Sequence, residues 1–75
     1  MANVTPLAAL TVPLGGQQIE LQEIDYETGG IRLLRVRIRE GRRFTVFDID
    51  HQTARAWGEA MLAWSAREAG AKEGK

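Results

Sequence analysis

The chain has 75 residues, 44% of them apolar, which suffices for one small domain with a thin core and leaves no room for a second. Ten basic and ten acidic side chains cancel, so the molecule as a whole exerts no electrostatic pull on nucleic acid or acidic lipid. Cysteine is absent, which excludes disulfides, thiolate metal sites and a cysteine nucleophile.

The N-terminal segment carries no targeting pattern. Residues 1–14 contain no lysine or arginine and are interrupted by two prolines, whereas a secretory signal needs a basic start and an apolar run. Arginine dominates the basic residues, and alanine and glycine are abundant, a pattern typical of GC-rich bacterial coding. We therefore expect a cytoplasmic, bacterial protein without membrane contact.

The segments between glycines alternate apolar and polar residues with period two up to residue 50, which predicts four strands. We expect these strands at residues 7–13, 19–26, 31–39 and 43–49, with turns at 15–16, 27–30 and 40–42. Two prolines place the first strand at a sheet edge. The fold class is α+β: a four-stranded antiparallel β-meander followed by one C-terminal α-helix packed on the sheet.

The helix is predicted from residue 50, where the apolar period lengthens. Asp50 is placed to accept the free amides of the first turn, and Trp57, Met61 and Trp64 recur at three- and four-residue spacing typical of a core-facing stripe. Gly70 is a plausible stop. We expect a single domain over residues 1–75, ordered over about 7–69, with a frayed tail at 70–75.

Cross-strand pairing can be predicted by matching apolar with apolar and acidic with basic residues. The best match pairs Leu10 with Leu21 in the first hairpin, Ile19 with Ile38 and Glu20 with Arg37 in the second, and Val36 with Val46 in the third.

These registers place apolar side chains on both faces of the sheet. The larger patch holds Leu10, Val12, Ile19, Leu21, Leu34, Val36, Ile38, Phe44 and Val46. The smaller patch holds Ile24, Tyr26, Ile31, Leu33, Phe47 and Ile49. One helix covers only the larger patch, so we predict a homodimer across the smaller one. The alternative is that aligned bulges bring all these side chains to one face of a monomer.

Basic residues concentrate in the third strand and the turn after it. We predict that four of them, on one face, contact an anionic surface of a protein partner: Arg35, Arg37, Arg39 and Arg43. The alternative is that they only pair with the acidic second strand and fix its register.

The element order and the segment Phe44-Thr45-Val46-Phe47-Asp48-Ile49-Asp50-His51-Gln52-Thr53-Ala54-Arg55-Ala56-Trp57 resemble the last strand and helix start of the positive cofactor four type of single-stranded DNA-binding protein. The resemblance covers roughly residues 18–64 and implies binding of single-stranded nucleic acid by the same arginines. The lysine-rich turn of that family has no counterpart here.

The sequence thus predicts a non-catalytic binding or accessory module that forms a homodimer and contacts an unknown protein partner. The alternative is a single-stranded nucleic-acid-binding protein. Asp48, Asp50 and His51 form the only cluster of metal-ligand types, but Asp50 is better used as a helix cap. We expect no metal, no cofactor and no enzymatic activity.

Overall fold

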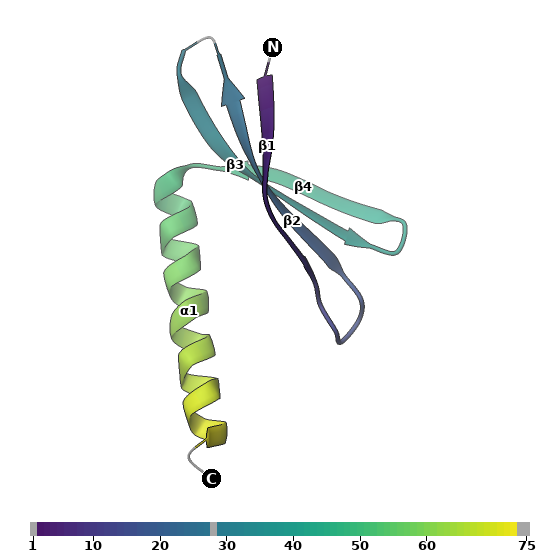
Figure 1. Cartoon of the computed structure of the whole chain (residues 1–75), viewed down its shortest axis with the longest axis vertical. Coiled ribbons are helices and arrows are strands. Elements are labelled where there is room, and N and C mark those ends of the chain that lie inside the picture. Colours follow the sequence, from purple (N-terminus) through teal and green to yellow (C-terminus); the bar gives the residue numbers. More distant parts are fainter. Residues whose placement is uncertain (1, 28, 74–75) are drawn as a thin grey trace.

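A computed structural model describes residues 2–27 and 29–73 of the chain. Four strands are followed by one helix (Figure 1): β1 (Ala2–Thr11), β2 (Gln18–Tyr26), β3 (Ile31–Glu40), β4 (Arg43–Ile49) and α1 (His51–Glu73). The strands form one antiparallel sheet in the order β1-β2-β3-β4, and the helix packs on β3. The predicted four-stranded meander with a C-terminal helix is confirmed.

The first strand was predicted too short at its N-terminal end. It begins at Ala2 rather than at residue 7, and it lies at a sheet edge as predicted. Its pairing with β2 shifts between Pro6 and Ala8, which leaves Leu7 as the extra residue of a bulge. A proline lacks the amide hydrogen that a sheet ladder needs, and an edge beside a bulge is where one is tolerated.

The helix also runs further than predicted. It continues through Gly70 to Glu73, so the predicted stop at Gly70 is wrong. A glycine that ends a helix adopts a left-handed backbone, and Gly70 does not have a positive φ. Residues 74–75, the end of the predicted tail, lie outside the described residues.

The second hairpin has the predicted register, and the other two do not. In the second, Ile19 pairs with Ile38 along an uninterrupted ladder. In the first, a loop closed by the Val12 amide and the Gln17 carbonyl (2.8 Å) moves the pairing by two residues, so that Leu10 lies opposite Ile19. A shift by two keeps each side chain on its predicted face.

The third hairpin is shifted by one residue, which does change faces. Val36 pairs with Phe47 instead of Val46. Glu40 and Arg43 are partners, so the turn has only two residues, Gly41 and Arg42, rather than the three predicted. Gly41 has a φ of 61° and Arg42 has a negative φ, the pattern of a type II′ turn with glycine in first place. This tight turn sets the register of β4.

The two faces of the sheet can now be defined. The helix-side face carries Leu10, Ile19, Leu21, Leu34, Val36, Ile38, Phe47 and Ile49. The outer face carries Val4, Glu20, Ile24, Tyr26, Ile31, Leu33, Arg35, Arg37, Arg39, Phe44, Val46 and Asp48. Apolar residues of β2 and β3 therefore do lie on opposite faces at the two ends of the sheet, and no bulge interrupts their pairing.

The helix begins at a well-formed cap. The Asp50 carboxylate accepts hydrogen bonds from the amides of Gln52 (3.1 Å) and Thr53 (3.2 Å), and the Thr53 hydroxyl donates to its other oxygen. These bonds satisfy amides that have no partner within the helix, as predicted for Asp50. They also hold the pKa of the Asp50 carboxyl below its usual range, with the Thr53 hydroxyl as the largest cause.

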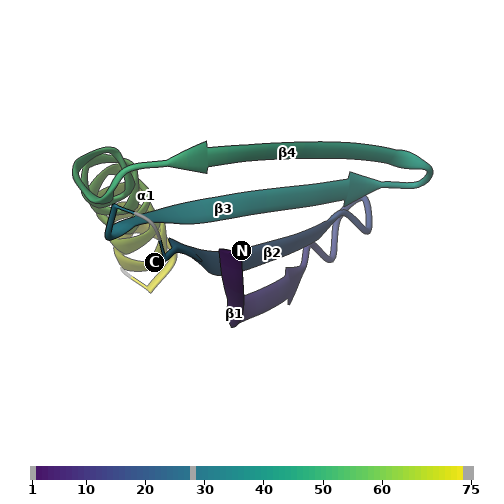
Figure 2. The same cartoon turned by 90° about the horizontal axis from the view of Figure 1, so that it is seen from above.

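Beyond its first turns, the helix leaves the sheet. Viewed along the short axis, sheet and helix diverge from the point where β4 ends, and from above the helix stands at that end of the strands (Figure 1 and Figure 2). Trp57, Met61 and Trp64 are 41%, 51% and 58% exposed, so the prediction that they form the core of a single chain is wrong. The reason is geometric, because only the N-terminal part of α1 reaches β3.

Candidate interaction surface

The isolated chain leaves an unusually large surface uncovered. Its accessible area is 6304 Å², whereas a folded monomer of 8.3 kDa is expected to expose about 4,600 Å². Among the described residues, the fully buried apolar side chains are Ile24 and Val36, which lie on opposite faces of the sheet. The chain therefore lacks a continuous core of its own, and about 1,700 Å² is in excess.

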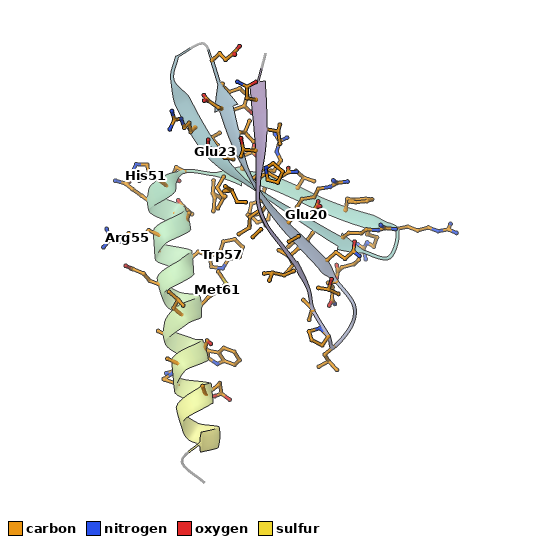
Figure 3. All side chains as sticks on the ribbon, in the orientation of Figure 1. Glu20, Glu23, His51, Arg55, Trp57 and Met61 are labelled. Carbon is orange, nitrogen blue, oxygen red and sulfur yellow. The ribbon has the colours of Figure 1, made fainter. Side chains whose placement is uncertain are left out.

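Part of this excess lies where the helix and the sheet diverge. Trp57 and Met61 leave the helix on the side turned toward the sheet (Figure 3). The Trp57 ring reaches Phe47 at the root of this angle, with ring centroids 6.0 Å apart. Further out, Trp64 on the helix and Leu10 on the sheet are both more than half exposed. We call the helical side chains Trp57, Met61 and Trp64 the helix stripe.

The structure divides the six residues predicted as an interface. Four of them, Ile24, Tyr26, Ile31 and Leu33, share the outer face at the end where β2 turns into β3. Ile24 is buried there, Leu33 is half-buried, and Tyr26 and Ile31 are exposed. Because the third hairpin has the shifted register, the remaining two residues, Phe47 and Ile49, lie on the helix-side face.

The exposed apolar side chains that border the angle between helix and sheet are the helix stripe together with Leu10 and Phe47 on the helix-side face. Sequence reasoning assigned the stripe to the core, although its spacing correctly identified which side chains need burial. For β4, the signal that would have found the right face is the Gly41-Arg42 turn, because a two-residue turn fixes the register.

Three of the four predicted anion-binding arginines, Arg35, Arg37 and Arg39, share the outer face and have partners within the chain. The prediction that Arg43 shares that face is wrong, because the shifted register makes Arg43 the strand partner of Glu40 and places it on the helix-side face. Arg35 forms a two-pronged pair with Asp48, at 2.8 and 3.0 Å. Arg37 donates to Glu20 at 3.3 Å, and Arg39 donates to the Gly41 carbonyl at 3.0 Å. Within residues 2–27 and 29–73, no acidic side chain pairs with Arg43.

The Arg35–Asp48 pair is the best-formed ion pair of the described sheet. Both side chains are more than two-thirds covered, and both nitrogen–oxygen contacts are short. The guanidinium holds the pKa of the Asp48 carboxyl below its usual range, and the carboxylate in turn raises the pKa of Arg35. This pairing links β3 to β4 and leaves Arg35 little capacity for an external anion.

Phe44 lies among the arginines of the same face. The guanidinium of Arg37 lies 4.8 Å from the centre of its ring, and that of Arg39 lies 5.7 Å away. Arginine over an aromatic face is a favourable contact that also holds the guanidinium in place. The shifted register explains this cluster, because it moves Phe44 from the predicted apolar patch to the arginine face.

The polar residues around the helix start have structural roles. Asp48 pairs with Arg35 and Asp50 caps the helix, and the described residues contain no group of three metal-ligand side chains. An open hollow at the helix start is lined by residues that include Glu23, Arg32 and His51. In the part of the chain that the structure describes, the helix is not apolar enough over a sufficient length to cross a membrane.

One family model matches the chain, over residues 1–67. It describes DUF6967, a family of unknown function. The chain belongs to the DUF6967 family. The match includes all four strands and the helix from its start to Arg67, so the helix stripe and both faces of the sheet of this DUF6967 chain lie within the matched residues. No curated protein matches the chain significantly, and no solved structure does.

Proposed function

We propose that this DUF6967 chain is a non-catalytic binding module that works as a homodimer and contacts a protein partner. The observation that carries the proposal is the uncovered apolar surface between the helix stripe and the helix-side face of the sheet. The excess of about 1,700 Å² per chain becomes about 3,400 Å² for two chains, within the range of 2,000–5,000 Å² buried by obligate homodimers.

A second copy is the occupant that best fits this surface. A chain of this length buries too little area to be comfortably stable alone, and small domains commonly compensate by pairing. The net charge of zero means that two copies do not repel each other over long range. The dimer we propose therefore uses the helix-side face, which holds Phe47 and Ile49 but not the other four residues of the patch that the sequence indicated.

The test is the mass of the protein in solution, measured by size-exclusion chromatography with light scattering at several concentrations. We expect twice the chain mass. Phe47→Asp, on the helix-side face, should give a monomer or an unfolded chain, because it places a charge beside Trp57 where the helix stripe meets the sheet. The matched control is Phe44→Asp on the outer face, which should keep the dimer mass. A wild-type monomer at high concentration contradicts the proposal.

For the partner, we propose an acidic protein segment that meets the β3–β4 turn. Arg39, Arg42 and Arg43 stand against Glu40 there, which gives this turn a local charge of about plus two. Fluorescence anisotropy with a labelled oligoglutamate peptide tests this at low and moderate salt. Arg43→Glu should abolish binding, and Arg67→Glu, on the helix, should not.

The same assay with a single-stranded oligonucleotide separates the two partner classes. Because Arg35 and Arg37 are paired within the sheet, we expect no salt-sensitive binding of the oligonucleotide. Binding of the oligonucleotide but not of the peptide overturns the protein-partner proposal and leaves the homodimer untouched.

A further inference from the structure

We propose that two copies exchange helices, so that the helix stripe of each chain packs on the helix-side face of the other chain's sheet. This inference rests on the proposed homodimer and specifies its architecture: two sheets outside and two helices between them. It follows from the shape of the single chain, the area left uncovered and the size of the two surfaces.

The angle between helix and sheet supplies the space. The helix is 23 residues long, about 35 Å, and only its first turns lie against β3 (Figure 1). The molecule is accordingly extended, with dimensions of 53 × 30 × 15 Å. The stripe and the helix-side face border the same open angle, so whatever enters it touches both. A helix of a second copy enters it symmetrically, because a two-fold axis makes each contact reciprocal.

The two surfaces match in size. From Trp57 to Trp64 the helix rises about 10 Å, and four strands span about 14 Å between the outermost strand axes. The stripe is thus long enough to cross about three of the four strands of the helix-side face. The outer positions of this face include Leu10, which is 59% exposed, and Phe47, which is 38% exposed.

The uncovered area favours a helix on a sheet over a pair of helices alone. Full burial of Trp57, Met61 and Trp64 removes roughly 350 Å² from water, taking about 250 Å² for a whole tryptophan side chain. That is about a fifth of the excess of 1,700 Å². A contact between stripes alone therefore leaves Leu10 and the half-buried apolar residues of the helix-side face uncovered, whereas reciprocal docking covers them together with the stripe.

The spread of the chain agrees with this arrangement. Its radius of gyration is 15.3 Å, whereas a compact chain of this length is expected to have about 11 Å. About 15 Å is the expectation for a compact body of twice the length. A chain whose helix packs on the sheet of a partner extends across the whole dimer, so its own radius of gyration approaches that of the dimer.

Photocrosslinking distinguishes this architecture from other dimers. A single introduced cysteine can carry the probe, because the chain has no cysteine of its own. Met61→Cys is labelled with a benzophenone maleimide, co-refolded with ¹⁵N-labelled wild type and irradiated, and mass spectrometry then maps the links between chains. We expect links to the helix-side face of the partner. Leu62→Cys, next to it but off the stripe and 72% exposed, is the matched control and should give at least about fivefold fewer links.

A reciprocal probe covers the case in which the label at position 61 prevents pairing. The same reagent on Leu10→Cys should link to the stripe of the partner helix, and on Ala9→Cys, which faces the other way, it should not. A wild-type dimer whose probes at 61 and 10 link no more often than their controls overturns helix exchange but leaves the homodimer standing. A wild-type monomer overturns both, and light scattering shows that independently.

Discussion

The thermal stability of this protein should depend on its own concentration. Two chains that fold together are favoured by mass action as the concentration rises, whereas the midpoint of a folded monomer does not move. The large uncovered surface of the single chain makes this a direct test of whether folding and pairing are coupled. The perturbation is dilution alone, so no substitution complicates the result.

The expected size of the effect follows from chain length. Unfolding near 60 °C releases about 2.1 cal/mol/K per residue, so two chains of 75 residues release about 0.3 kcal/mol/K. A tenfold change in concentration is worth about 1.4 kcal/mol. The ratio of these values predicts that the midpoint rises by about 4 °C for each tenfold increase in concentration.

Circular dichroism melts at roughly 1, 10 and 100 µM measure this slope, and a second scan of each sample establishes that unfolding is reversible. Phe47→Asp, if it still folds, should have a lower midpoint and no slope. A reversible wild-type midpoint that moves by less than about 1 °C across the whole range would refute the coupling of folding to pairing.

Three further predictions test the fold itself. Ile24→Ala should lower the free energy of unfolding by about 2–5 kcal/mol, because Ile24 is 1% exposed. The matched control Ile31→Ala, at an exposed position of the same face, should lower it by less than about 0.5 kcal/mol. Urea titrations of the two variants measure both values. Gly41→Ala should destabilise by about 1–2 kcal/mol in the same assay, since its φ of 61° suits glycine, and an unchanged midpoint would contradict the proposed turn type. The pKa of Asp50 is lower in the folded chain than its ordinary value of 3.8, so its carboxylate stabilises the fold above that value, and this stabilisation is lost as the pH falls through the folded pKa. The unfolding midpoint should therefore fall on acidification below about pH 4. It should fall less steeply in Asp50→Asn, which keeps a cap without the charge.

The parts of the fold that the sequence predicted are those whose signals are local. The second hairpin was placed correctly because its strands carry complementary charges, such as Glu20 opposite Arg37, and apolar partners in a single register. The cap at Asp50 was found for the same reason, because an acceptor directly before a helical pattern satisfies free amides without help from the rest of the chain.

The register of β4 could not be decided by matching residue types. Val36 meets an apolar partner whether it faces Val46 or Phe47, so both registers satisfy the pattern. The turn decides between them, because a two-residue loop that starts with glycine matches the twist of a hairpin better than a three-residue loop without a left-handed residue at its end. The candidate site inherited this error, since Phe47 and Ile49 changed faces with the strand.

The N-terminal half of β1 carried only a short signal. Its alternation of apolar and polar residues runs from Ala2 to Thr5 and ends at Pro6, and the bulge at Leu7 inverts which positions face the helix side. Because it is an edge strand that contains a proline, it is held by pairing with β2 rather than by its own preference for an extended form. Such a strand becomes predictable only after its neighbour has been placed.

The helix stripe shows a different limit of sequence reasoning. Spacing at three and four residues identifies Trp57, Met61 and Trp64 as side chains that need burial, and this holds whether the covering surface belongs to the same chain or to another. Choosing between the two requires knowing where the helix points, and that depends on the link after β4, where Asp50 follows the strand without an intervening loop. With no residues to turn the helix back over the sheet, it leaves along the end of β4, and the stripe needs a surface that its own sheet does not offer.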